Sequence, residues 1–264
     1  MKSINITFAV TLLLAAGLLF TGCQSSEKKD STDTMDTSTS KHNTLTDAEK
    51  EDGWVLLFDG ETTEGWRGYK KDNFPKAWII EDNSLKIQGS GRGELGAEDG
   101  GDIIYDTKEF SDFHLKLEWK VAEGANSGIF YRGEEVEQFD YIWKTAPEMQ
   151  VLDNENHPDA ELGRDGNRKS SSLYDLIPAE PQNSKPFGEW NNVEVIAEGD
   201  HIIHKQNGVE VVEYNVGSAR MDSLIAISKW AEYENWGDFA STGYIGLQDH
   251  GNDVWFRNIK IKEL

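Results

Sequence analysis

The sequence predicts an all-β protein, built as an antiparallel β-sandwich. Three observations lead to this prediction: apolar and polar residues alternate with a period of two, glycine-containing turns recur at short spacing, and aromatic residues make up 11% of the chain. No stretch after Cys23 shows the apolar spacing of a helix of three turns. Strands of this kind bury one face each by packing as two sheets around a common core.

The strands can be placed in order along the chain. In residues 113–121 (FHLKLEWKV) every second residue is apolar, which predicts a strand with one buried face. Residues 190–216 predict three strands joined by tight turns at Gly199-Asp200 and Asn207-Gly208, since Asn-Gly favours a two-residue hairpin turn. Residues 243–251 and 254–264 predict the last two strands.

Residues 147–154 (PEMQVLDN) predict a strand whose polar face has chemical interest. Glu148 and Gln150 share one face, while Met149 and Val151 share the other. Because the apolar pair belongs in the core, we expect the carboxyl and the amide to point outward into a groove on the sheet.

The first part of the chain reads as an export signal. Lys2 precedes the apolar run 8–20 and the residues TGC, which is typical of a signal peptide over residues 1–22. We expect Cys23, the only cysteine, to carry a lipid anchor, although Phe20 departs from the usual leucine of such a site. Residues 23–52 are rich in Ser, Thr and Asp, which predicts a flexible tether, and residues 53–264 form the folded domain.

Composition limits the functions that are possible. The net charge of −22 repels phosphate backbones and argues against a nucleic-acid partner. With one cysteine there is no cysteine-based zinc site, and the six histidines lack the spacing of a helical metal motif. The chain has no glycine-rich phosphate loop and no G-x-S-x-G motif.

Other segments supply candidate site residues. Arg132 ends the stretch NSGIFYR and is positioned to pair with Glu148 or to hold a substrate oxygen. His250, in the stretch LQDHG, can move a proton near neutral pH. We therefore name Glu148, His250 and Arg132 as candidate catalytic residues.

Further residues are candidates for substrate binding. Long irregular segments at 154–190 and 228–242 are expected to wall the site. The predicted substrate-binding residues are Gln150, Asp153, Lys229, Asn126, Gln248 and Trp230. For Asp153, His250 and Trp230 a purely structural role, as a turn cap, a strand-end contact or a core residue, stays open.

Eight segments in order resemble the bacterial 3-keto-disaccharide hydrolase domain family. They are LFDGETTEGW, NSGIFYR, EMQVLDN, SLYDLI, GEWN, NGVEVVEY, GLQDHG and VWFRNIKIKEL, and they cover nearly all of residues 53–264. The resemblance implies a jelly-roll sandwich of the concanavalin-like lectin and glucanase type. It also implies a cell-envelope lipoprotein, periplasmic or on the outer-membrane surface, that acts on glycosides already oxidised at carbon 3 by a separate sugar oxidoreductase.

The strand 148–153 fits this expectation. Glucanases of the related laminarinase type carry Glu-x-Asp-x-x-Glu on one strand, whereas here Gln150 replaces the middle acid and no second glutamate follows. Cleavage of a 3-keto sugar needs only one base to remove the carbon-2 proton, a donor to the enolate oxygen and an acid for the leaving group. We expect Glu148 or His250 as the base, and Arg132 or Lys229 at the carbonyl oxygen. A divalent cation held by Asp153, Asp249 and His250 would serve the same purpose as that donor.

Three other functions remain compatible with the sequence. The chain is alternatively a non-catalytic carbohydrate-binding lipoprotein, a hydrolase of unmodified glycans, or a scaffold subunit of a surface complex.

Overall fold

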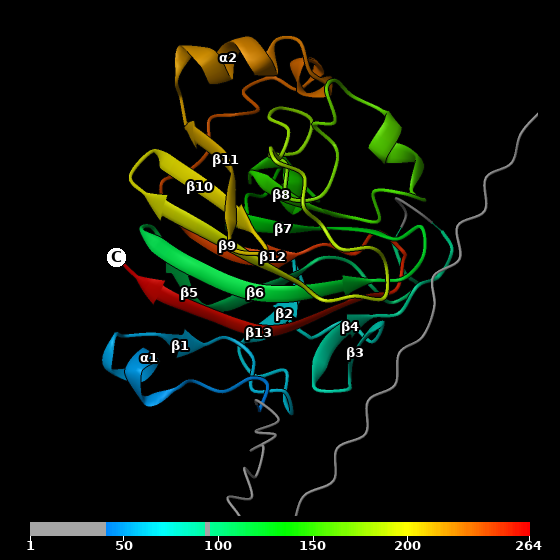
Figure 1. Ribbon diagram of the computed structural model, residues 1–264, viewed down its shortest axis with the longest axis vertical. Coiled ribbons are helices and arrows are strands. Elements are labelled where there is room, and N and C mark those ends of the chain that lie inside the picture. Colours follow the sequence, from blue (N-terminus) through cyan, green and yellow to red (C-terminus); the bar gives the residue numbers. More distant parts are fainter. Residues whose placement is uncertain (1–40, 93–95) are drawn as a thin grey trace, which may run out of the picture. The chain divides into compact units, whose positions relative to one another are not determined.

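The computed structural model describes residues 41–92 and 96–264, which form two stacked β-sheets (Figure 1). The larger sheet has the strand order β11-β10-β9-β6-β13-β4-β3, and β1 pairs with β13. Its strands are β1 (Val55–Leu56), β3 (Trp78–Glu81), β4 (Ser84–Ile87), β6 (Phe113–Val121), β9 (Asn191–Glu198), β10 (His201–Gln206), β11 (Val209–Asn215) and β13 (Val254–Glu263). The predicted leader, with Cys23, lies outside the described residues.

The smaller sheet carries the site. Its strand order is β2-β5-β12-β7-β8. The strands are β2 (Trp66–Gly68), β5 (Ile103–Phe110), β7 (Asn126–Gly133), β8 (Glu148–Leu152) and β12 (Gly243–Leu247). All strand pairs in both sheets are antiparallel, as the alternation of residues predicts.

Helices in the described part of the chain are short. They are α1 (Asp47–Glu51), α2 (Ala219–Ile225) and the 3₁₀ turns η2 (Ile142–Lys144), η3 (Pro158–Glu161) and η4 (Lys229–Glu232). The long segment after β8 and the segment after α2 both lie near β8 in Figure 1. None of these helices is long and apolar enough to cross a membrane.

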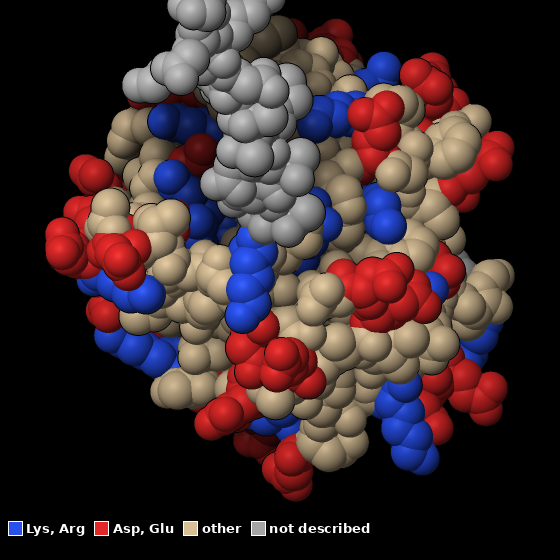
Figure 2. All heavy atoms as spheres, turned by 60° about the horizontal axis from the view of Figure 1, so that its bottom comes forward, with Lys and Arg blue, Asp and Glu red and all other residues tan. Residues whose placement is uncertain are grey.

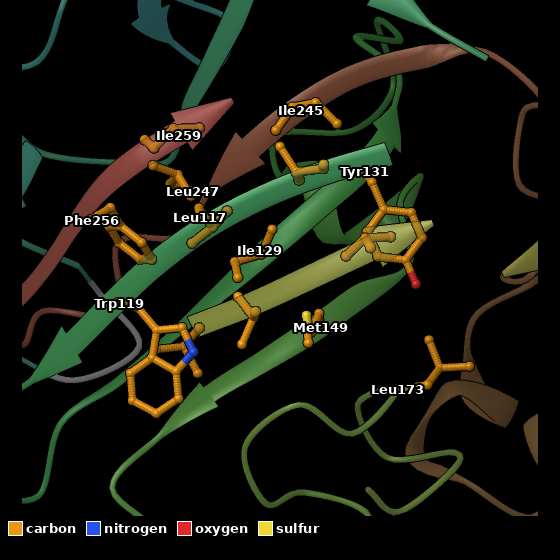
Figure 3. Close-up of a cluster of buried hydrophobic side chains, with 14 of the residues drawn as sticks. Leu117, Trp119, Ile129, Tyr131, Met149, Leu173, Ile245, Leu247, Phe256 and Ile259 are labelled. Carbon is orange, nitrogen blue, oxygen red and sulfur yellow. The ribbon is translucent and has the colours of Figure 1, made fainter. Parts of the chain in front are cut away.

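The core fills the space between the sheets (Figure 3). In β6 each alternate residue from Phe113 to Val121 is buried and those between are partly exposed. Leu117 and Trp119 from the larger sheet face Ile129, Met149 and other apolar residues of the smaller sheet. Burial of this apolar surface is the main force that holds the two sheets together.

The two predicted hairpins are confirmed. Asn207 and Gly208 both have positive φ angles, 49° and 81°, as the turn type favoured by Asn-Gly requires. The β9–β10 connection likewise turns at Gly199, which has φ 55°. These turns set the register in which β9, β10 and β11 pair.

The end of the predicted tether differs from expectation. Residues 41–52 are not free of the sandwich: Asn43 is buried, and α1 starts with a capping box between Thr46 and Glu49. Lys262 of β13 pairs with Asp52 at 2.6 Å. The polar composition predicted a free tether because it shows only the lack of apolar residues, whereas hydrogen bonds and ion pairs hold this segment.

Figure 2 shows the charged side chains on one face of the protein. On the face shown in Figure 2, acidic and basic side chains are interspersed with neutral ones. The excess of acid in the sequence is therefore not presented there as one continuous patch.

Candidate active site

A cavity of about 750 Å³ lies on the outer face of the smaller sheet. Its floor is formed by residues of β7 and β8 and the residues that follow β12, and its walls come from the loops around them. The volume is within the range of small-molecule sites in proteins. Seven of the predicted site residues line it: Glu148, Gln150, Asn126, Lys229, Trp230, Gln248 and His250.

Glu148 reaches the cavity through the alternation of β8. Met149 and Val151 are in the core, which turns Glu148 and Gln150 to the outer face. Both polar side chains are nevertheless buried, at 6% and 1% exposure, so they line a site rather than face bulk water. The carboxyl of Glu148 lies where a side chain of Gly128, on β7, would otherwise be.

Burial changes the acidity of Glu148. Removal of the carboxyl from water raises its pKa well above the usual range, since the charged form loses solvation. The Lys229 cation lowers the pKa in opposition, while the negative charge of Asp102 raises it further. In turn, burial lowers the pKa of Lys229, and Glu148 opposes that change.

Amide groups on the floor are available to a ligand. The side-chain oxygens of Asn126 and Gln248 are buried and accept no hydrogen bond from the described residues. Gln150 is fixed more firmly, because its side-chain oxygen accepts from the Val151 N–H at 3.1 Å. A buried acceptor without a donor is costly, so a ligand hydroxyl or water is expected to satisfy Asn126 and Gln248.

Lys229 is a cation that lines the cavity, and it begins η4. Its Nζ lies 4.1 Å from the ring centre of Tyr174 and 4.4 Å from that of Trp230. Both aromatic faces favour the ammonium form. The backbone N–H of Lys229 donates to Asp175 at 2.8 Å, which ties η4 to the loop after β8.

An ion-pair network supports that attachment. Arg168 donates to Asp175 at 2.5 Å and to Asp159 at 2.8 Å. Tyr174 also donates to Asp159, at 2.7 Å. Hydrogen bonds and ion pairs therefore hold the loop segment 159–175 together, in addition to its contact with η4.

Trp230 forms one wall and is held by other aromatic rings. It stacks on Trp236 with ring centres 4.1 Å apart and planes 4° apart. Its Nε1 donates to the carbonyl of Tyr174 at 3.2 Å. Trp143 and Tyr233 complete the aromatic wall, with ring centres 5.3 Å apart. Such rings can pack against the apolar face of a sugar.

His250 lines the cavity just beyond β12. Its ring centre is 6.1 Å from that of His157, in an edge-to-face arrangement. Asp249 also lines the cavity, and its carboxylate accepts hydrogen bonds from the N–H groups of Ala97, Gly101 and Gly251 at 2.7–2.9 Å. Asp249 therefore joins the loop before β5 to the end of β12.

Arg132 is not where the sequence analysis expected it. A positive φ angle of 53° at Arg132 interrupts the alternation of β7. Its guanidinium donates to the carbonyls of Ser111, at 2.6 and 2.9 Å, and Gly199, at 2.8 Å, away from the cavity. The predicted pairing of Arg132 with Glu148 is wrong, and the residue stabilises two turns instead.

Asp153 also lies outside the cavity lining. Its carboxylate accepts from Gly124 N at 2.7 Å, Glu155 N at 3.2 Å and Asn156 Nδ2 at 2.8 Å. The structural alternative, a turn cap, describes Asp153. In the described residues no group of three or more His, Cys, Asp or Glu is placed to hold a metal ion, so the set Asp153, Asp249 and His250 is not assembled.

Several lining residues were missed from the sequence. Asp102 lines the cavity from the residue before β5, and Lys71, Tyr69 and Tyr174 contribute from loops. Asp102 follows a run of glycines and acids that has no periodic pattern. Only the antiparallel pairing of β5 with β12, which no local signal encodes, brings it to the site.

An antiparallel sandwich with a polar, aromatic-walled cavity on one sheet is typical of carbohydrate-active proteins. The chain belongs to the family described as the 3-keto-alpha-glucoside-1,2-lyase-like domain, whose model matches residues 53–262. It is 48% identical over 230 residues to a 3-keto-disaccharide hydrolase of Bacteroides thetaiotaomicron, covering 81% of this chain and 79% of that protein.

Solved structures agree with this assignment. A candidate glycosyl hydrolase of Parabacteroides distasonis superposes with a TM-score of 0.72 and 29% identity, covering 85% of this chain and all of that one. A second candidate glycosyl hydrolase from the same organism has a TM-score of 0.59 and 26% identity, covering 80% and 99% of the two chains. The predicted sandwich fold and family are confirmed.

Proposed function

We propose that this protein cleaves the glycosidic bond of 3-keto-glycosides, by removal of the carbon-2 proton followed by elimination. The observation that carries the proposal is a buried carboxyl, Glu148, in one cavity with the cation Lys229 and with unsatisfied amide acceptors. The relative from Bacteroides thetaiotaomicron, named as a 3-keto-disaccharide hydrolase, supports the same class of substrate.

The chemistry follows from the ketone. A carbonyl at carbon 3 makes the proton on carbon 2 acidic, so one base can remove it and leave an enolate. When the carbonyl re-forms, the electron pair makes a double bond between carbons 1 and 2, and the glycosidic oxygen leaves with a proton. Addition of water across that bond places oxygen on carbon 1 and hydrogen on carbon 2, and the net change is hydrolysis.

Glu148 is the base that we favour. Because its pKa is raised, its ionised form is a stronger base than an ordinary carboxylate, which suits a carbon acid. His250 remains the second candidate, since its ring lines the same cavity. Lys229 is the remaining candidate for the enolate oxygen after Arg132 is set aside, and an ammonium beside that oxygen stabilises charge as it forms.

The rest of the lining binds the sugar. Asn126 and Gln248 accept hydrogen bonds from hydroxyl groups, Gln150 orients a further hydroxyl, and Trp230 packs against the ring. A non-catalytic lectin would need these contacts but would gain nothing from burying a carboxyl whose ionisation is unfavourable. The observation on Glu148 therefore favours an enzyme over a binding module.

Two variants test the assignment. Glu148→Gln and His250→Ala are assayed separately on 3-keto-glucosides and on the same glucosides without oxidation. We expect Glu148→Gln to lose about 10²–10⁴-fold in kcat, and we expect wild type to cleave only the oxidised sugar. Near wild-type rates in both folded variants, or equal cleavage of unoxidised glucosides, would contradict the proposal.

We also propose that the protein acts in the bacterial cell envelope, anchored by a lipid on Cys23. The signal-like residues 1–22 and the cysteine at their end support this. Its substrate requires a prior oxidation at carbon 3, so a sugar oxidoreductase acts upstream. Labelling of cells with a fatty-acid analogue tests the anchor, because Cys23→Ser should lose the label.

A further inference from the structure

Asp102 occupies a defined position opposite Glu148 on the floor of the cavity. It precedes Ile103, which pairs with Leu247 of β12, and Leu247 pairs with Ile129 of β7. The backbone N–H of Gln248 donates to Gly128 at 2.9 Å. Asp102, Gln248 and Gly128 therefore form one row across three neighbouring strands.

The spacing along this row suits a sugar ring. Two strand spacings separate the backbone of Asp102 from that of Gly128, which is about 10 Å. The carboxyl of Glu148 lies over Gly128, so it approaches Asp102 along the row. The two residues line the same cavity.

Asp102 is held firmly in this position. Its carbonyl accepts from Tyr69 N at 2.8 Å, and its Oδ1 accepts from Asp249 N at 2.9 Å. Asp249 in turn accepts from Gly101 N at 2.7 Å. These contacts orient the Asp102 carboxyl within the cavity.

The surroundings of Asp102 raise its pKa into the neutral range. Burial is the main cause that raises its pKa, to about 7; the charge of Asp249 acts in the same direction, whereas the hydrogen bond from the Asp249 N–H and the charge of Lys71 oppose it. Tyr69 and Glu148 are the other titratable groups that face it. A group that titrates near neutral pH can both give and take a proton during turnover.

We infer that Asp102 is the acid that protonates the leaving glycosidic oxygen, in partnership with Glu148 as the base. The inference rests on the proposed function. In the elimination, the Glu148 carboxylate takes the carbon-2 proton, the bond from carbon 1 to oxygen breaks, and Asp102 gives its proton to that oxygen. In the hydration, Asp102 takes a proton from the water that adds to carbon 1, and Glu148 returns its proton to carbon 2, so both residues regain their initial state.

The neighbouring acids are already engaged in other contacts. Asp249 accepts three backbone hydrogen bonds, and Asp159 is bonded to Arg168 and Tyr174. Lys71 is exposed and donates to the carbonyl of Gly100. Asp102 is thus the acid best placed to protonate a leaving group across from Glu148.

Leaving-group dependence tests the inference. Asp102→Asn keeps an oxygen that accepts from Asp249 N but carries no acidic proton. We expect its kcat on methyl 3-keto-glucoside to fall about 100-fold or more, with KM nearly unchanged. On the 4-nitrophenyl 3-keto-glucoside, whose leaving group departs without a proton, the rate of nitrophenolate release in a single turnover, which reports the elimination alone, should fall less than about 5-fold.

The comparison variant is Asp249→Asn, which loosens the same loop. It should reduce activity on both substrates by a similar factor, as a structural effect would. If Asp102→Asn behaves in this way, or loses no activity on either substrate, the inference is overturned. If wild type cleaves neither substrate, the proposed function itself fails, so the two failures are distinct.

Wild type alone gives a second test that does not depend on the folding of a variant. With the methyl glycoside, kcat should rise and then fall with pH, because Glu148 must be ionised and Asp102 protonated. With the nitrophenyl glycoside, the rate of nitrophenolate release in a single turnover should show no fall at high pH. A fall of equal size with both substrates would contradict the role of Asp102.

Discussion

Glu148 has room for its carboxyl only because the neighbouring strand carries a glycine. The three atoms that would lie nearest to a Cβ at Gly128 all belong to Glu148, and its Cδ would be only 2.8 Å away. No backbone atom is among them, so a larger residue at position 128 would displace the Glu148 carboxyl rather than the backbone. Gly128 is therefore a determinant of the site rather than of the fold.

Replacing this glycine should reduce activity more than stability. In Gly128→Ala we expect Glu148 to be displaced by about 1 Å and kcat to fall on the order of 10²-fold, with a small change in Tm. Gly246→Ala is the matched control, since a Cβ there would crowd Ile142, 2.8 Å away, and not Glu148. Kinetics on a 3-keto-glucoside and thermal unfolding of both variants measure the difference. An active Gly128→Ala would show that the position of the carboxyl is not critical.

Asp102 links function to stability through its pKa. An ordinary aspartate carboxyl has a pKa of 3.8, and that of Asp102 in the fold is about 7, so between these pH values the folded chain holds a proton that the unfolded chain releases. Below about pH 4 both states are protonated and the group adds no pH dependence. Between about pH 4 and pH 7 the Asp102 carboxyl ionises in the unfolded state but not in the folded state, which lowers the free energy of the unfolded state. Wild-type stability therefore falls by up to about 4 kcal/mol as pH rises. Because Asp102 is partly exposed, solvent screening reduces that figure.

Asp102→Asn should therefore be stabilising at neutral pH while it is inactivating. We expect its free energy of unfolding to exceed that of wild type by a margin that grows from pH 4 to pH 7 and then stays constant. Denaturant unfolding across this range measures the margin. Asp99→Asn, at an exposed position in the same loop, should show no such growth. A margin that does not vary with pH would mean that Asp102 is ionised normally.

The strands show what a sequence can reveal about this protein. The alternation in β6 and β8 and the Asn-Gly turn before β11 are local signals, and each correctly predicted a strand, its buried face or a turn. Because burial of Met149 and Val151 decides the orientation of β8, Glu148 and Gln150 were placed correctly without any knowledge of their partners.

Local signals failed where a single backbone angle or a distant strand decides the outcome. Alternation along β7 predicts that Arg132 shares the outer face with Asn126, but the positive φ angle at Arg132 sends its side chain to two turn carbonyls. Asp102 has no pattern of its own, and it reaches the site through pairing between residues almost 150 positions apart in sequence. Period-two patterns contain neither kind of information.

The turn η4 owes its position to a loop rather than to the sheet. Its first residue, Lys229, is attached through its backbone to Asp175, whose other oxygen binds Arg168. The side chain of Asp175 is only 4% exposed, so this contact is shielded from water. The network thus fixes the backbone of Lys229, the residue that we propose for the enolate oxygen.

A double-mutant cycle can isolate this positioning role. We expect Asp175→Asn to lower kcat on a 3-keto-glucoside about 10-fold, because η4 is less constrained, and to lower Tm. In the Lys229→Met background, the same change should have almost no further effect on kcat, since the group being positioned is gone. Independent, multiplying effects of the two changes would show that Asp175 acts on catalysis by another route.

At the scale of the whole molecule, the segment 41–52 links the start of the domain to its last strand. Asn43 donates to the Asn258 side chain at 2.6 Å, and Asn258 N donates back to Asn43 at 2.7 Å. Asn43 also donates to the carbonyl of Asn83 at 2.8 Å and is 4% exposed. Its positive φ angle of 54° is one that asparagine tolerates better than most residues.

Asn43 should therefore contribute to stability although it lies in a polar, low-complexity stretch. We expect Asn43→Ala to lower the free energy of unfolding by about 2–3 kcal/mol, because buried partners lose their hydrogen bonds and alanine is strained at positive φ. Asn43→Gly loses the same bonds without the strain, so it should be about 1 kcal/mol less damaging. A chain that starts at residue 41 should match wild type in denaturant unfolding, and one that starts at residue 53 should be at least as unstable as Asn43→Ala. Equal free energies of unfolding for those two truncated chains would mean that residues 41–52 contribute nothing to the stability of the sandwich.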